Sequence, residues 1–262
     1  MNSELIQEVA DGIYQIRGRQ GAAHIYIVKG SRRTVMIDSG LSQTFAITQS
    51  ALAELGMTPG DIDLVLLTHD HIDHAGGAPL MPTSCVVAAH RMSAEKLALK
   101  DEFAQYNQVF AAGFAHVQVD VCLEHGSIID TGSHQLEVIY TPGHCSGAIC
   151  LYEHRTRAMF TADVIMANGV VGGVVASGNI SDFIGSLRRL RPWHIDLLLP
   201  GHGATSTEAL RCIDIGIARL ETLLRETRDI FSAMTGADHG YASIMRSLRG
   251  LNAASHPDAD AG

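Results

Sequence analysis

Short runs of branched and other apolar residues alternate with polar turns along most of the chain. Runs of roughly four to eight such residues are typical of β-strands, whereas apolar positions spaced three and four apart over longer stretches are typical of helices. The pattern predicts strands at 13–17, 24–29, 34–38, 63–67, 85–89, 136–140, 148–152, 159–161 and 195–199. It predicts helices at 43–55, 91–99, 181–190, 206–234 and 241–251, and irregular chain from about 100 to 126.

The order of these elements repeats loosely in two halves, each a run of strands followed by a helix and another strand. Two sheets covered by helices on their outer faces would bury the apolar runs, which predicts an α/β fold. Residues 1–203 would form this domain. Residues 204–252 would form a helical extension of it, because the helices after Gly203 have no strand partner. Residues 253–262 are small and polar and are predicted to be disordered.

Composition narrows the classes of function. The chain has 262 residues and 46% hydrophobic content, and its net charge of −9 argues against a nucleic-acid partner or an anionic membrane surface. It contains no apolar run of the roughly 18 residues that a membrane helix requires. We therefore expect a soluble, cytoplasmic protein. The five cysteines are an odd number without a close CxxC pair, which predicts neither a disulfide framework nor a thiolate zinc finger.

The segment from Thr68 to Gly77, THDHIDHAGG, concentrates candidate metal ligands directly after a predicted strand. Neutral imidazole and carboxylate groups are good ligands for zinc, iron and manganese. His69 and His71 are two apart and can face the same way in extended chain, whereas Asp73 and His74 can point to a neighbouring position once the loop turns. One loop could therefore supply ligands to two metal positions.

Three more candidate ligands follow predicted strands in the same way. His144 comes after the strand at 136–140 and a Thr-Pro-Gly turn, and Asp163 comes after the strand at 159–161. His202 follows the strand at 195–199 and a Pro-Gly turn. Five of the 14 histidines thus stand at strand ends in a recurring order, and we interpret them as metal ligands. The other nine are interpreted as structural.

With these residues in this order, the chain resembles the metallo-β-lactamase superfamily over roughly residues 10–203. In that family an HxHxDH loop, a Gly-His pair, a later Asp and a final Gly-His supply a two-metal centre in a four-layer αβ/βα sandwich. The resemblance implies this fold, here with extra C-terminal helices. It implies one metal held by His69, His71 and His144, a second held by Asp73, His74 and His202, and a bridging carboxylate from Asp163.

Two positions depart from the usual residues of the family. Ala162 precedes Asp163 where glycine is usual, and alanine is small enough to keep the close approach. Cys145 follows His144 where a hydroxyl residue is commoner. Because the ligand set is already complete, we expect Cys145 to lie beside the metal ligands rather than among them.

Two metals bridged by one carboxylate can lower the pKa of a water held between them, so that hydroxide is available at neutral pH. The resemblance thus implies a hydrolase in which the bridging hydroxide attacks an activated carbonyl, and Asp73 is expected to carry a proton to the leaving group. Thioesters of the acyl-CoA or acylglutathione type and lactones suit this chemistry. The β-lactamases of the family have Cys or Ser at the position of Asp163, which argues against antibiotic hydrolysis.

Two other functions stay open. A mononuclear iron oxygenase resembling the persulfide dioxygenases would share the HxHxDH loop, although the retained Asp73, His74 and His202 favour the hydrolase. The protein could also act mainly as an effector that binds a ligand, with incidental hydrolase activity. We expect zinc, but the same ligands accept iron or manganese. The expected partner is a small-molecule acyl substrate, and the sequence is compatible with a homodimer.

The segment 101–115 contains aromatic residues at spacings of three, four and four, which predicts one face of a helix. These residues are Phe103, Tyr106, Phe110 and Phe114. We favour packing of this face against the core. The alternative is a hydrophobic lid for an acyl chain.

Overall fold

The structure is a computed structural model that describes residues 5–107, 116–175 and 177–235. By its internal contacts the chain divides into two units, residues 1–218 and residues 219–262. The first unit contains both β-sheets and the helices between their strands. The helix predicted at 241–251 and the tail predicted to be disordered lie outside the described residues. Within the described ranges, no helix is long and apolar enough to cross a bilayer.

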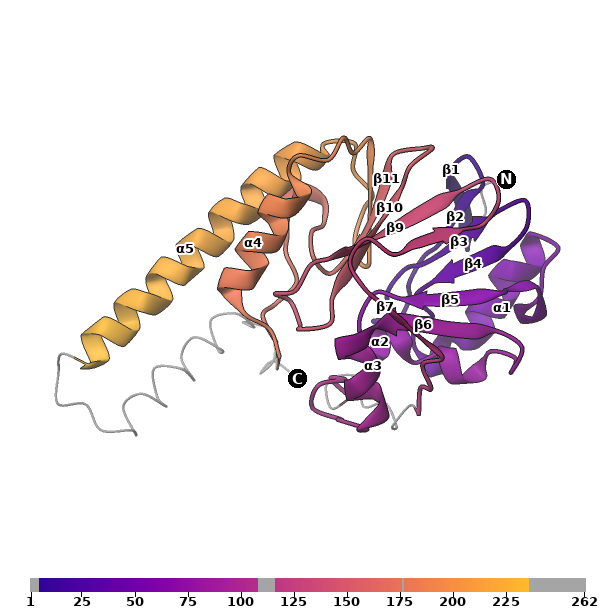
Figure 1. Ribbon diagram of the computed structural model, residues 1–262, viewed down its shortest axis with the longest axis horizontal. Coiled ribbons are helices and arrows are strands. Elements are labelled where there is room, and N and C mark those ends of the chain that lie inside the picture. Colours follow the sequence, from indigo (N-terminus) through magenta and orange to yellow (C-terminus); the bar gives the residue numbers. More distant parts are fainter. Residues whose placement is uncertain (1–4, 108–115, 176, 236–262) are drawn as a thin grey trace. The chain divides into compact units, whose positions relative to one another are not determined.

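Seven strands form the first sheet, in the order in which they occur along the chain (Figure 1). The first three pairings are antiparallel and the last three are parallel. The strands are β1 (Ile6–Ala10), β2 (Ile13–Ile16), β3 (Ile25–Lys29), β4 (Thr34–Ile37), β5 (Leu64–Leu67), β6 (Val86–His90) and β7 (Val121–Leu123).

Five strands form the second sheet, in the order β12-β11-β10-β9-β8. All neighbours are antiparallel except β11 and β12, which are parallel. The strands are β8 (Ile128–Asp130), β9 (Gln135–Tyr140), β10 (Ile149–Glu153), β11 (Ala158–Ala162) and β12 (Leu197–Pro200).

Helices lie between these strands and after β12. The α-helices are α1 (Phe45–Glu54), α2 (Ile72–Ala75), α3 (Arg91–Ala98), α4 (Ile180–Leu190) and α5 (Ala209–Thr235). Four short 3-10 helices are η1 (Ser42–Thr44), η2 (Pro59–Asp61), η3 (Ala78–Leu80) and η4 (Ala167–Gly169). The start of α4 is typical of a capped helix, because the Asn179 side chain accepts hydrogen bonds from the backbone N–H groups of Ser181 and Asp182.

The core consists of separate layers because successive side chains of a strand point to opposite faces of the sheet. Tyr26 and Val28 pack between the two sheets with residues of the second sheet such as Phe160. Ile27, between them in sequence, packs on the other face with Leu52 of α1. Figure 1 shows α1 on the outer side of the first sheet and α4 on the outer side of the second. The predicted four-layer αβ/βα sandwich is confirmed.

The sequence analysis did not predict three short strands, β1, β7 and β8. It predicted no strand at β1, and it predicted irregular chain where β7 lies. β7 and β8 each have only three residues, and Val121, Cys122 and Ile128 in them are exposed. An edge strand of three residues is too short to show an alternation of apolar and polar residues. It is a strand because it pairs with a neighbouring strand, not because one of its faces is buried.

The two sheets meet at the edge where β5, β9, β11 and β12 end. The backbone N–H of Ile149 donates to the carbonyl of Thr68 across this edge at 2.9 Å. The Tyr26 hydroxyl donates to the carbonyl of Pro200 at 2.7 Å. Each bond joins the carboxyl end of a strand in one sheet to the beginning of a strand in the other, and the predicted ligands follow carboxyl ends at this edge.

Candidate metal centre

The loop after β5 bends at residues 68–70 and then turns into a single turn of helix. His71 still has extended backbone angles, φ −68° and ψ 144°, and α2 begins at the next residue. His69 and His71 therefore lie on the loop before the helix, whereas Asp73 and His74 lie on α2. The backbone N–H of Ser39 donates to the carbonyl of His74 at 2.7 Å and fixes the helical turn from outside. The change of direction predicted from sequence thus separates two pairs of side chains.

The first group of side chains brings three imidazoles together. Nε2 of His69 lies 2.9 Å from Nδ1 of His71, and Nε2 of His144 lies 3.0 Å from the same atom. All three side chains are buried. The His144 ring is held from behind, where its Nδ1 lies 2.6 Å from the carbonyl oxygen of Gly173. With one nitrogen of His144 bound in this way, its other nitrogen is directed at the group.

The second group joins α2 to the loop after β12. Nε2 of His202 lies 3.1 Å from Oδ2 of Asp73, and Nε2 of His74 lies 3.6 Å from the same oxygen. Asp73 and His74 are buried, and His202 is partly exposed. This group therefore has its open side at His202.

Asp163, directly after β11, lies between the two groups. Its Oδ1 is 3.3 Å from Nε2 of His74 and 3.6 Å from Nε2 of His202. Its Oδ2 is 3.5 Å from Nε2 of His144. The two oxygens of one carboxylate thus face different groups. All seven residues predicted as ligands are brought together by the fold.

Small residues let the backbone approach the site closely. A side chain at Gly201 would place its Cβ 2.6 Å from Cε1 of His74 and 2.8 Å from Oδ1 of Asp163, which leaves no room for one. Ala162 has φ 42°, a left-handed conformation that favours glycine. The departure from the usual glycine at Ala162 therefore carries a backbone cost, which the sequence analysis did not foresee.

The donor atoms fit a divalent cation in each group. Nε2 of His74 and Oδ1 of Asp163 are buried without a hydrogen-bond partner in the described part of the chain, although nearly all buried polar atoms in proteins have one. In each group, one potential ligand atom from every member lies within 4.8 Å of the others. Imidazole nitrogens with carboxylate oxygens are a donor set that zinc, iron and manganese accept. A cation would satisfy the unpaired atoms.

The pKa values of His69 and His71 are shifted in the opposite direction to that of His74. Burial and the neighbouring imidazoles lower the pKa of His69 and His71, which favours the neutral form that a metal ligand must have. Burial also acts to lower the pKa of His74, but the nearby carboxylates, Asp73 foremost, outweigh it and raise that pKa well above its ordinary value. Burial acts to raise the pKa of Asp163, but His74 beside it lowers that pKa. The negative charge of the site is concentrated around the second group.

Asp38 is a residue of the site that the sequence analysis missed. It follows β4, is buried, and its Oδ2 lies 2.7 Å from Nδ1 of His74. The backbone N–H and the hydroxyl of Thr68 also donate to its carboxylate. A carboxylate that binds one ring nitrogen of a histidine fixes the proton there and leaves the other nitrogen free to bind a metal. The signal in the sequence that could have identified Asp38 was its position at the end of a strand, like the positions of the ligands.

Tyr106 covers the first group, in a segment where the sequence analysis predicted one face of a helix. That prediction is wrong for residues 101–107, which form turns, because Tyr106 has φ 63° and an α-helix cannot continue through a left-handed residue. Phe103 is 62% exposed, whereas the Tyr106 ring stacks on His71 with centroids 5.6 Å apart. The two aromatic residues therefore do not share a packed face. Phe110 and Phe114 lie outside the described residues.

Cys145 lies beside the ligands, as expected. Its thiol is buried and its Sγ is 3.8 Å from Oδ1 of Asp70, outside both groups. Burial raises the pKa of this thiol far above its usual value, which keeps it protonated. Cys145 is therefore not a thiolate ligand in this arrangement.

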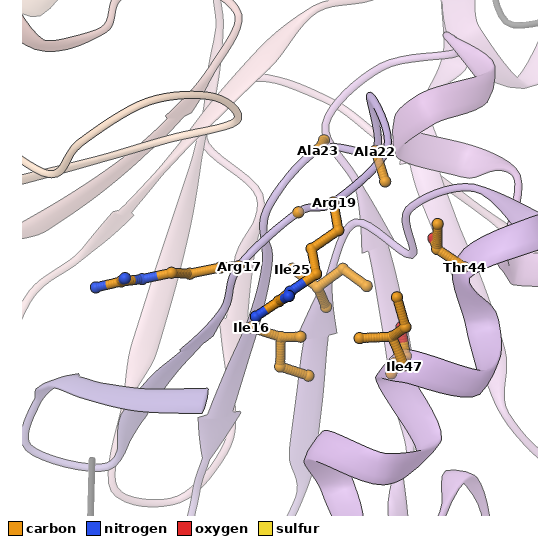
Figure 2. A pocket seen from close by; sticks show the side chains of 10 residues that line it. Ile16, Arg17, Arg19, Ala22, Ala23, Ile25, Thr44 and Ile47 are labelled. Carbon is orange, nitrogen blue, oxygen red and sulfur yellow. The ribbon is translucent and has the colours of Figure 1, made fainter. Parts of the chain in front are cut away.

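A small hollow beside the loop after β2 offers no room for a substrate (Figure 2). It encloses about 10 Å³, roughly the space for one water molecule. Its lining includes Arg19, Ile25 and Ile47, and Figure 2 shows Arg17 pointing away from these side chains.

The fold and the site together define a class: an αβ/βα sandwich with paired histidine and carboxylate groups at the edge where its two sheets meet. The sequence profile of the metallo-beta-lactamase superfamily matches residues 18–202. The chain belongs to this superfamily, which confirms the resemblance seen in the sequence.

Several relatives carry hydrolase names. Human acyl-coenzyme A thioesterase MBLAC2 is 29% identical over 226 residues, covering 75% of this chain and 80% of the relative. Hydroxyacylglutathione hydrolase GloC of Haemophilus influenzae is 26% identical over 155 residues, covering 56% of this chain and 71% of the relative.

Solved structures share the fold. A motif mutant of the metallo-beta-lactamase of Cronobacter sakazakii superposes with a TM-score of 0.72 at 21% identity, covering 87% of this chain and 99% of that one. The FEZ-1 metallo-beta-lactamase of Legionella gormanii gives a TM-score of 0.72 at 18% identity, covering 87% and 98%. At these identities the likeness concerns the fold alone.

Proposed function

We propose that the protein is a metal-dependent hydrolase that binds one divalent ion in each group, most simply zinc, and cleaves thioesters of the acyl-CoA or acylglutathione type. A lactone is the other substrate that this chemistry suits. The observation that carries the proposal is the position of Asp163, whose two oxygens face the two groups at 3.3 Å and 3.5 Å. A carboxylate in that position is suited to hold two ions at the short separation of a two-metal hydrolase.

The metals would polarise the carbonyl and make hydroxide available at neutral pH. The chain's own residues hold the geometry. Asp163 sets the separation of the two groups, and Asp38 fixes the proton of His74 on Nδ1. Asp73, beside the open side of the second group, is the residue placed to pass a proton to the leaving group. A thiolate leaving group needs little of this help, which favours thioesters over amides.

The names of the relatives support this substrate class. An acyl-coenzyme A thioesterase and a hydroxyacylglutathione hydrolase both act on thioesters, and their alignments cover 75% and 56% of this chain. We prefer the two-metal hydrolase to a mononuclear iron oxygenase because Asp73, His74 and His202 converge as a complete second group. A ligand-binding effector would not require that group at all.

The test combines metal content with substrate cleavage. Purified protein loaded with Zn²⁺ should contain two ions per chain and should hydrolyse at least one of a short-chain acyl-CoA, a long-chain acyl-CoA, an acylglutathione and an acyl-homoserine lactone. Asp163→Asn should lower both metal content and rate, whereas the matched control His154→Gln, an exposed histidine paired with Glu137, should change neither.

Three results would count against the proposal. Two bound ions with no cleavage of any of these substrates would remove the hydrolase. A single iron per chain, with oxygen consumption in the presence of a persulfide, would support the oxygenase instead. Unchanged cleavage in Asp163→Asn would show that the carboxylate facing both groups is not needed.

A further inference from the structure

A second cluster of charged and polar side chains lies beside the first group and contains none of its ligands. Asp70 stands between His69 and His71 in the loop after β5. Its side chain is fully buried, and its Oδ1 lies 2.7 Å from Nζ of Lys96. The hydroxyl of Ser93 donates to the same oxygen at 2.8 Å. Both partners belong to α3.

Lys96 reaches a second segment as well. Its Nζ donates to the hydroxyl oxygen of Ser177 at 3.0 Å, and that oxygen accepts the backbone N–H of Ser146 at 3.1 Å. Ser146 is two residues after the ligand His144. One ammonium group therefore connects the loop that carries His69 and His71 with the turn that carries His144.

Further contacts bind the same two segments together. The backbone N–H of Val175 donates to the carbonyl of His144 at 3.1 Å, so the chain around Ser177 is attached directly to a ligand residue. On the other side, a side chain at Gly147 would place its Cβ 2.1 Å from the hydroxyl oxygen of Ser93, so α3 packs directly on this turn. Among the described residues, the Lys96 ammonium bonds to Asp70, which stands between two ligands of the first group, and to Ser177, which binds the turn that carries His144.

A buried ion pair is a costly way to stabilise a fold, because its desolvation offsets most of the attraction between the charges. Such an ion pair can instead fix the positions of side chains, because an ammonium group has several donors and holds each acceptor that it binds. Side chains that hold ligands from outside the coordination sphere commonly change metal affinity by about 10- to 100-fold when they are removed.

We infer that Lys96 is a positioning residue for the first group: through Asp70 and Ser177 it holds the segments of His69, His71 and His144 in register for one metal ion. The inference rests on the proposed two-metal site. It assigns Lys96 no contact with substrate. It requires that loss of Lys96 weaken the first group and spare the second, whose members lie on α2 and after β12.

The test measures Zn²⁺ affinity at each group separately, by competition with a chromophoric chelator. A His202→Ala background disables the second group and reports the first, and a His69→Ala background reports the second. Lys96→Met should weaken Zn²⁺ binding about 10- to 100-fold in the first background. It should change binding by no more than about twofold in the other, the range of an unconnected substitution. Lys29→Met, at an exposed lysine, is the matched control.

A double variant keeps the test decisive if Lys96→Met does not fold. Lys96→Met with Asp70→Asn removes both charges, so no unpaired charge is left buried, and it should fold while still losing first-group affinity. Equal losses at both groups would show that Lys96 only supports the fold as a whole. Unchanged affinity at the first group would also overturn the inference. If wild-type protein bound no second ion, the proposed function would fail first, which separates the two outcomes.

Discussion

Replacement of Asp38 by asparagine should disable one metal position while the fold persists. The carboxylate accepts from Nδ1 of His74 with one oxygen and from the backbone N–H of Thr68 with the other. Asparagine keeps the size but has a single acceptor oxygen. If that oxygen stays with Thr68, the amide NH₂ faces Nδ1 of His74, which must then accept. The ring proton moves to Nε2, the atom that faces Asp73 and Asp163, and Nε2 can no longer bind a metal.

The size of the effect follows from the bond that is lost. A hydrogen bond to a charged group contributes about 1.5–3 kcal/mol. Because about 1.4 kcal/mol corresponds to a tenfold change in an equilibrium constant, metal affinity at the second group should fall roughly 10- to 150-fold in Asp38→Asn. The first group should keep its affinity for metal, because the hydrogen bonds that the structure describes for Asp38 go to His74 and Thr68 and not to a ligand of that group.

Zn²⁺ titration against a chelator, with two resolved binding steps in the wild-type protein, measures this directly. The matched control is Asp196→Asn, which alters a carboxylate paired with His194 at the surface, 3.1 Å away. It should leave both steps unchanged. Two wild-type binding steps in Asp38→Asn would refute the argument that Asp38 sets the tautomer of His74.

Three further results are expected. Chelation of the metals should lower the melting temperature, because an ion present at about 1,000 times its Kd stabilises the folded state by about 4 kcal/mol; an unchanged melting temperature would argue against tight binding. In metal-free protein, stability should be greatest near pH 6.5, the ordinary pKa of histidine. Below this pH the unfolded chain binds protons at His69 and His71 that the folded protein does not bind, because folding lowers their pKa, so the free energy of unfolding falls as the pH falls. Above this pH the stabilisation from protonated His74, whose pKa is raised in the folded protein, decreases as the pH rises toward that raised pKa. Denaturant midpoints across pH 5–8 measure this, and a steady rise with pH would contradict it. Tyr106→Phe should leave KM unchanged, whereas Tyr106→Ala should alter KM about 2- to 10-fold, because an aromatic contact contributes about 0.5–1.5 kcal/mol; equal KM values in steady-state assays of both variants would exclude the ring from the substrate path.

The ligand set could be predicted from sequence because its signal is local. Each ligand type follows a recognisable strand, and the spacing of His69, His71, Asp73 and His74 already implied two directions. The longer strands and helices could be predicted for the same reason, since burial imposes a period on them. β7 and β8 could not, because their neighbours define them rather than their own pattern.

Contacts between residues far apart in sequence could not be predicted. Asp38 and His74 are 36 residues apart, and Lys96 and Ser177 are 81 residues apart. Their roles depend on which side chains the fold places within about 3 Å. The strand-end position of Asp38 could mark it as a candidate for the site but not identify His74 as its partner, and Lys96 shows no such local signal. The prediction of a helix through Tyr106 was also wrong, because the spacing of aromatic residues does not reveal that this residue has a left-handed backbone conformation.

The family, the sandwich, the seven candidate ligands and their expected division into two groups could be taken from the sequence, because each depends on short stretches of chain and on the family resemblance that they carry. The measured distances of Asp163 to both groups, and the contacts of Asp38 and Lys96 with the segments that carry the ligands, required the folded structure. Hydrogen bonds and ion pairs act over a few ångströms, and the distance between two residues is set by the fold rather than by their separation along the chain.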